Sequence, residues 1–137
     1  MIDLTQSHDV LGAYHKTDFS KVLKQYHDPA TQYAHDVLGG KYTTGYLMKL
    51  SAFRHLRDLQ RVSDSDFPFH YDTKEVDKIL KFASIAPNVD TGEPTKLMAW
   101  QKFIFGELFG WRVELNTTRF TRVILSVARG QGKTYLM

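Results

Sequence analysis

Five consecutive residues near the C-terminus, Gly130-Gln131-Gly132-Lys133-Thr134, have the composition of a phosphate-binding loop. In such a loop, successive backbone N–H groups surround the anion, and glycines allow the dihedral angles and the close approach that this requires. The lysine reaches the outer phosphates, and the threonine hydroxyl coordinates Mg²⁺. The sequence therefore predicts a nucleotide site with Mg²⁺ in which Lys133 and Thr134 make the main contacts.

The residues before the loop help to decide between a nucleotide site and an ordinary turn. The common pattern GxxxxGK[ST] would place a glycine where this chain has Val127. A Gly-Lys-Ser/Thr tripeptide also arises by chance in about one chain in fifteen of this size, and it is then an exposed turn. However, Phe120 to Val127 is a nearly continuous apolar run, which is typical of a strand covered on both faces. A strand leading into the loop favours the nucleotide site.

The elements that position this strand and loop are predicted to be amphipathic helices. Asp28 can cap a helix that begins at Pro29, and Asp72 followed by Glu75 resembles a capping box. Apolar residues recur every three or four positions, so each helix has one apolar face. The predicted helices are Phe19 to Tyr26, Pro29 to Leu38, Thr43 or Thr44 to Val62, Thr73 or Lys74 to Ala86, and Ala99 to Phe109. The expected core residues are Phe53, Leu56, Ile79, Leu80, Trp100, Ile104 and Leu108.

The composition limits the classes of protein that this chain can represent. A length of 137 residues suits one domain with a real core, and the absence of cysteine excludes a disulfide framework or a thiolate metal site. No signal peptide and no membrane-spanning apolar run is present, so we expect neither secretion nor a membrane partner. The net charge of +3 comes from residues 67–137, which hold ten basic and seven acidic side chains. An anionic partner fits this excess, although no basic run marks a nucleic-acid groove.

The surroundings of the loop resemble a known family. Loops of the form Arg-x-x-Gly-Lys-Ser/Thr, preceded by a small residue, are similar to those of phage terminase large subunits, and here Ala128 precedes Arg129. The stretch LMAWQKFIFGELFGW, Leu97 to Trp111, resembles the adenine-binding segment of that family, with its leucine, aromatic-Gln pair and closing Phe-Gly-Trp. Tyr33 to Leu59 and Phe69 to Phe82 are similar to its N-terminal helical region. The resemblance covers about residues 32–137.

The resemblance implies an ATP-driven motor that threads viral DNA into a capsid, and whose complete chain also carries a nuclease domain. Lys133 would contact the β and γ phosphates, and Thr134 would bind Mg²⁺ through its hydroxyl. Arg129 would lie beside the phosphates and stabilise charge on the transferred phosphoryl group. Gln101 would hydrogen-bond the adenine edge, with Trp100 or its neighbours packed near the base. The implied partners are the small terminase subunit, the portal protein and double-stranded DNA, in the cytoplasm of an infected bacterial host, and an oligomer is compatible with this role.

The expected fold class is mainly α in this chain. A helical N-terminal region precedes the first strand and the phosphate loop (P-loop) of an α/β P-loop NTPase domain. Residues 1–31 are expected to be an N-terminal segment that can be mobile, and residues 32–96 the helical region. Residues 97–137 are expected to begin the ATPase domain with the adenine-binding segment, the strand and the loop.

Two other functions remain open at this point. The chain can be a non-catalytic docking module whose helices between Pro29 and Ala86 bind the small terminase subunit or the portal protein. It can also be an unrelated P-loop protein such as a small kinase, which would need its acidic Mg²⁺-binding strand within this chain. A downstream apolar strand ending in Asp-Glu would favour the motor, whereas a true end at Met137 would favour docking.

Three groups of side chains have simpler interpretations. Arg54, Arg57 and Arg61 recur on one helix face and are expected to be solvated, paired in part with Asp58. The six histidines lack the spacing and the carboxylate neighbours of a zinc site. The aromatic residues between 100 and 111 are expected to be core rather than a platform on which bases stack.

We predict that this chain by itself does not hydrolyse ATP at a meaningful rate. In the family that it resembles, the acidic strand end that helps to hold Mg²⁺ and the water-activating glutamate lie beyond the position of residue 137, as do the nuclease carboxylates. Phosphoryl transfer requires Mg²⁺ and positioned charges acting together. The measurement is phosphate release with Mg²⁺ and DNA, for the parent chain and for Lys133→Ala. Robust turnover that depends on Lys133 would contradict the prediction.

Overall fold

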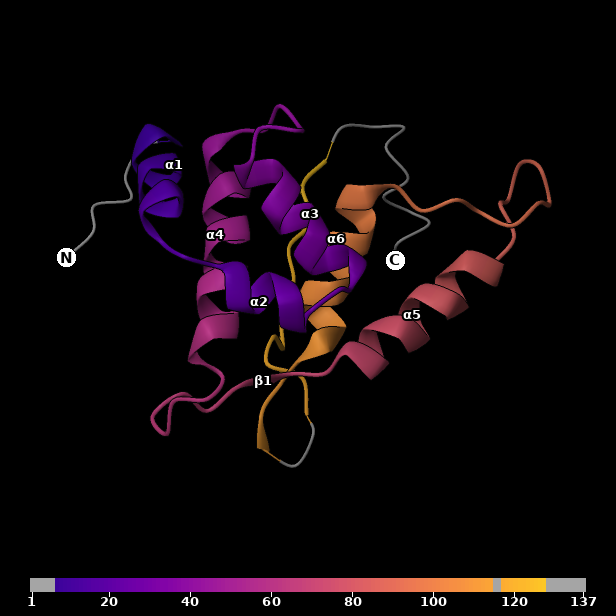
Figure 1. Ribbon diagram of the computed structural model, residues 1–137. Coiled ribbons are helices and arrows are strands. Elements are labelled where there is room, and N and C mark those ends of the chain that lie inside the picture. The colour runs from indigo at the N-terminus through magenta and orange to yellow at the C-terminus, as the bar shows by residue number, and fades with distance from the viewer. Residues whose placement is uncertain (1–6, 115–116, 128–137) are drawn as a thin grey trace.

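The structure is a computed structural model that describes residues 7–114 and 117–127 (Figure 1). The described residues form six helices and one two-stranded antiparallel sheet, so the prediction of a mainly α chain is confirmed. None of these six helices is both long and apolar enough to span a lipid bilayer. The elements are α1 (Ser7–Lys16), α2 (Ser20–Gln25), α3 (Pro29–Leu38), α4 (Tyr46–Arg61), β1 (His70–Tyr71), α5 (Thr73–Ile85), α6 (Ala99–Gly110) and β2 (Trp111–Arg112).

Helices α3 and α5 begin at the predicted caps. The Asp28 side chain accepts a hydrogen bond from the Thr31 backbone N–H at 3.1 Å, and Pro29 occupies the first position of α3. Asp72 accepts from the Lys74 backbone N–H at 2.9 Å. The second half of the predicted capping box does not form, because the backbone N–H of Asp72 donates to the Gly110 carbonyl at 2.8 Å. The cap therefore also ties the start of α5 to the end of α6.

Helix α3 packs between α4 and α6, and these three helices form the centre of the molecule (Figure 1). The approach of α6 to α3 depends on Gly106, because a Cβ atom at this position would overlap the Cβ of Ala30. Gly110 allows a similar approach, since a Cβ there would lie 2.7 Å from a methyl group of Val76. Small residues on α6 thus let two other helices pack closely against it.

The N-terminal region contains more helix than the sequence predicts. Besides α2, which corresponds to the predicted helix at residues 19–26, the structure contains α1, which packs against α4. Val10 of α1 is fully buried, and Phe19 packs edge-on against Phe53 with ring centroids 5.9 Å apart. The apolar residues of α1 are too few and too irregularly spaced to predict the helix from the sequence. Packing against α4 stabilises α1, and this contact is not visible in the local pattern.

The predicted core is only partly correct. Phe53 and Leu56 are buried as expected. The other five expected core residues are only half-buried: Ile79, Leu80, Trp100, Ile104 and Leu108. Helix α5 projects to one side and contacts mainly α6, so much of its surface is exposed (Figure 1). The last three residues belong to α6 and line a cavity, which explains their partial exposure.

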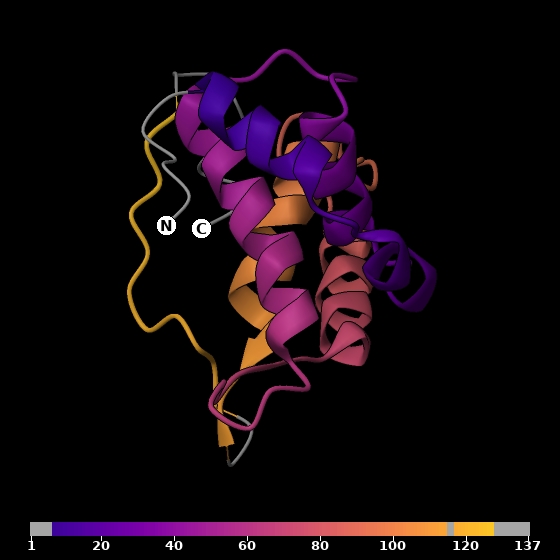
Figure 2. The same cartoon turned by 60° about the vertical axis from the view of Figure 1, so that its left-hand side comes forward.

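The strand predicted at Phe120 to Val127 is wrong. Residues 120–127 have no regular secondary structure, and within the described residues the sheet consists of β1 and β2 alone, with His70 opposite Arg112 and Tyr71 opposite Trp111. An apolar run favours extended backbone, but a strand also needs a neighbour that supplies the ladder of hydrogen bonds. In this structure the segment runs along the helices, on the side opposite α5 (Figure 2).

We predict that Leu56→Ala lowers the free energy of unfolding by about 2 to 5 kcal/mol, because it leaves a cavity in the centre of the core. Leu56 has no exposed surface, whereas Leu47 on the same helix is 75% exposed. Leu47→Ala is therefore the matched control, with an expected change within about 0.5 kcal/mol. Urea unfolding followed by circular dichroism measures both, and equal midpoints would contradict this assignment of the core.

Candidate functional site

The structure describes only part of the predicted nucleotide site, namely the residues assigned to the base. Its loop residues lie outside the described residues: Arg129, Gly130, Gln131, Gly132, Lys133 and Thr134. The two predicted base-binding residues, Trp100 and Gln101, lie in the first turn of α6. They are neighbours in sequence but have different surroundings, because consecutive positions of a helix point about 100° apart.

Gln101 is buried and helps to begin α6. Its side-chain oxygen accepts a hydrogen bond from the Met98 backbone N–H at 2.8 Å, and the residue is 6% exposed. This bond satisfies one of the N–H groups that a helix start leaves without an intrahelical partner. Gln101 therefore has a structural role that the sequence analysis did not assign, and its contact with adenine stays a prediction.

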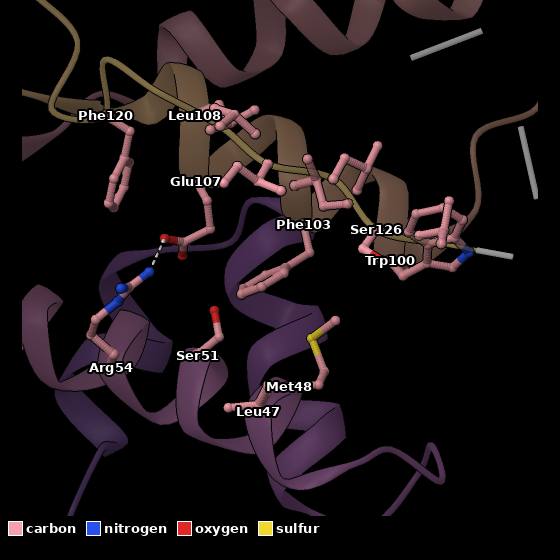
Figure 3. Close-up of a pocket in the computed structure, with 15 residues that line it drawn as sticks. Leu47, Met48, Ser51, Arg54, Trp100, Phe103, Glu107, Leu108, Phe120 and Ser126 are labelled. Carbon is pink, nitrogen blue, oxygen red and sulfur yellow. Dashed lines mark ion pairs between the residues drawn. The ribbon is translucent and has the colours of Figure 1, made fainter. Parts of the chain in front are cut away.

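Trp100 lines a cavity of about 510 Å³ between α4, α6 and the segment at residues 120–127. Figure 3 shows Trp100 at one end of this cavity, next to Ser126, and Leu47 and Met48 along its α4 side. The walls are mainly apolar, and the volume lies in the range of small-molecule sites. Ser126 and Val127 lie three and two residues before Arg129, where the predicted loop begins. The Trp100 end of the cavity therefore borders the part of the chain that leads into this loop.

The polar end of the same cavity contains an ion pair that the sequence did not predict. Arg54 of α4 and Glu107 of α6 face each other across it (Figure 3), with 3.7 Å between Nη2 and Oε2. Glu107 is only 7% exposed, and its Oε1 lies 2.5 Å from Nδ1 of the fully buried His55. This Oε1 takes part in no aligned hydrogen bond within the described residues. The Glu107 carboxylate therefore lies between Arg54 and His55 without a directed hydrogen bond at Oε1.

Behind Glu107, a chain of hydrogen bonds runs through the core. Trp111 Nε1–H donates to His55 Nδ1 at 3.2 Å. His55 Nε2 lies 2.9 Å from Thr31 Oγ1, and the Thr31 hydroxyl donates to Asp28 Oδ1 at 2.8 Å. Trp111 Nε1, both ring nitrogens of His55 and the Thr31 hydroxyl therefore each have a polar partner within the core.

Tyr71 completes this network from β1. Its hydroxyl donates to Asp28 Oδ2 at 2.7 Å. Burial, together with the nearby negative charge of Asp28, raises the pKa of Tyr71 well above its ordinary value. The phenol therefore keeps its proton and remains a donor to the carboxylate. The network joins α3, α4, β1 and β2 behind the cavity wall.

Arg119 fixes the start of the segment that closes the cavity. Its Nη1 donates to Asp58 Oδ2 at 2.8 Å, and its guanidinium lies over the Phe69 ring at 4.1 Å and the Trp111 ring at 5.3 Å. The Arg119 backbone N–H also donates to the Trp111 carbonyl at 3.0 Å. Asp58 is 2% exposed, so it does not belong to the solvated helix face that its sequence neighbours suggested. The sequence carries no local signal for this pair because 61 residues separate its members.

The cavity itself depends on this attachment. Phe120 follows Arg119 directly and lies under the Arg54 guanidinium, 5.3 Å from the ring centroid. Two arginines, one on the segment and one on α4, thus hold the two elements together. The position of residues 120–127, and with it the cavity wall beside Trp100, follows from these contacts.

We predict that Arg119→Ala releases residues 120–127 from α4 and speeds the hydrogen exchange of their backbone amides. The change removes a charge-assisted hydrogen bond to a buried carboxylate, which contributes about 1.5 to 3 kcal/mol. Arg122→Ala is the control, because Arg122 is exposed on the same segment. Exchange by mass spectrometry measures both variants. Equal exchange in Arg119→Ala and in the parent chain would show that this pair does not hold the segment.

Comparison with known proteins shows what this part of the chain is similar to. Residues 99–137 match the family model described as the terminase large subunit, ATPase domain. No curated protein and no solved structure gives a significant match. The match begins at the first residue of α6 and includes the cavity-lining segment and the predicted loop. From α6 onward the chain is similar to the ATPase domain of terminase large subunits, which confirms there the resemblance that the sequence suggested.

Proposed function

We propose that this chain supplies the N-terminal part of a large terminase subunit, the ATP-driven motor that packages viral DNA into a capsid in an infected bacterial cell. The match of residues 99–137 to a terminase ATPase domain carries the proposal. The proposed partners are double-stranded DNA, the portal protein and the small terminase subunit. The cavity beside the segment that leads into the loop supports a nucleotide site at this place.

In the proposed site, ATP with Mg²⁺ binds at the C-terminal end of residues 120–127. Lys133 contacts the β and γ phosphates, and Thr134 coordinates Mg²⁺ through its hydroxyl. The backbone of Gly130-Gln131-Gly132 surrounds the phosphates, and Arg129 stabilises the charge that develops on the transferred phosphoryl group. Each of these groups acts on the negative charge of the phosphates or on its counterion, so the site binds the phosphate end of the nucleotide most strongly.

The base is assigned to the start of α6. Trp100 borders the mainly apolar cavity next to Ser126, where an aromatic ring can cover the face of a base. The oxygen of the Gln101 side chain already accepts the Met98 N–H, so its NH₂ group is the part assigned to the adenine edge. This arrangement supports a base held between α6 and the segment that precedes the loop.

We predict that ATP with Mg²⁺ changes the tryptophan fluorescence of the chain, and that the change comes from Trp100. The chain has two tryptophans, and Trp111 has no exposed surface. Trp100→Phe should therefore abolish most of the response. Lys133→Ala should raise the Kd for ATP at least about tenfold, which corresponds to about 1.4 kcal/mol. Fluorescence titration measures both effects.

The control is Lys24→Ala on α2, which removes the same charge from an exposed position outside the cavity lining. It should leave the Kd for ATP unchanged. Tight ATP binding that survives Lys133→Ala would contradict the proposed site. Absence of ATP binding in the parent chain would count in favour of a docking function.

The exposed surface of α5 favours docking as a second candidate function. Phe82 is 68% exposed and Ile85 is 73% exposed, although both are large apolar residues. They lie in the last turns of α5, the helix that projects from the rest of the molecule (Figure 1). Phe82 and Ile85 lie three positions apart on α5 and are thus neighbours on its surface. Contiguous exposed apolar patches mark contacts between proteins. A docking role of this helix toward the small terminase subunit or the portal protein is compatible with the motor function.

A further inference from the structure

A second groove, with a volume of about 470 Å³, lies between α5 and α6. Its floor is apolar and includes Leu80 and Leu97. Its charged lining consists of three lysines and one aspartate: Lys81, Lys96, Lys102 and Asp77. The groove therefore has an excess of two positive charges. Because the chain as a whole has a net charge of only +3, this is a marked local concentration of basic side chains.

The three lysines come together only in the folded chain. Lys81 lies on α5, Lys96 on the connection before α6, and Lys102 on α6 itself. Within the described residues none of the three forms an ion pair, in contrast to Lys41, which pairs with Asp36, and Lys78, which pairs with Glu75. Their charges are thus available to an anionic ligand.

This groove is separate from the candidate nucleotide site. Trp100 lines the large cavity and Lys102 lines the groove, and two positions along a helix correspond to a rotation of about 200°. The groove therefore lies on the opposite face of α6 from the cavity. Figure 2 agrees with this placement, because residues 117–127 and α5 lie on opposite sides of the molecule.

We propose that the groove between α5 and α6 binds the phosphate backbone of double-stranded DNA. The three ammonium groups extend from three separate segments on flexible stems, so they suit phosphates spread along a backbone. Their long side chains act as point charges without a fixed hydrogen-bonding fork, so the contact is independent of base sequence. The choice of duplex DNA over another polyanion rests on the proposed function.

The proposal predicts how strongly the affinity for duplex DNA depends on salt concentration. A protein that neutralises Z phosphates of duplex DNA loses affinity with a slope of about −0.9Z in a plot of log affinity against log salt. Three lysines therefore contribute a slope of about −2.7. Asp77 repels the same phosphates, so Asp77→Asn should strengthen binding. An increase in affinity after substitution cannot come from damage to the fold.

The test is the fluorescence anisotropy of a labelled DNA duplex, titrated with the full chain at several NaCl concentrations. The triple variant Lys81→Gln, Lys96→Gln and Lys102→Gln should lower affinity at low salt at least about tenfold and reduce the slope by about 2.7. The matched control is Lys16→Gln, Lys21→Gln and Lys24→Gln, which removes the same charge from exposed positions on α1 and α2. This control should bind duplex DNA nearly as the parent chain does.

Each outcome decides the proposal. Equal loss of affinity in the two triple variants would show that binding depends on net charge alone, and would overturn the proposal that this groove binds DNA. Tighter binding of poly-glutamate than of the duplex would assign the groove to an acidic protein segment, which also overturns it. Absence of duplex binding, with ATP binding that depends on Lys133 retained, would reject the groove and leave the proposed function in place. Weaker binding in the groove variant alone, with stronger binding in Asp77→Asn, supports the proposal.

Discussion

The buried carboxylate of Asp28 is the group on which the packing of the helices depends. It caps α3 through the Thr31 N–H and accepts the hydroxyl groups of Thr31 and Tyr71. Through Thr31 it is linked to His55 on α4, and through His55 to Trp111. Burial of a charge is costly without partners, and here three donors offset that cost. The carboxylate therefore fixes how α3, α4, β1 and β2 meet.

The candidate site is attached to this centre by a second pair of buried charges. Arg119 binds Asp58 and stacks on the aromatic rings around Trp111, the residue that also donates to His55. The segment that lines the cavity thus begins at a rigid point of the core. The opposite face of α6 carries the lysine groove, so one helix connects the two sites.

Local signals predicted the helices well and the sheet badly. Helix α3 runs from Pro29 to Leu38 as predicted, because its start signals lie within a few residues of the backbone groups that they satisfy. The segment at residues 120–127 has the composition of a strand, but pairing depends on a distant neighbour. In the same way, the spacing of Trp100, Ile104 and Leu108 identified one helix face, while the other elements decided that this face borders a cavity.

By itself, the sequence determined the helical class of the chain, the caps at Asp28 and Asp72, and the resemblance of its C-terminal part to a terminase ATPase domain. These features depend on residues close together in the chain. Only the tertiary structure decided that Asp58 and Glu107 are buried ion partners, and that lysines from three segments share one groove. The members of these groups are far apart in the sequence, and their burial depends on how whole helices pack. No local pattern of residues encodes that packing.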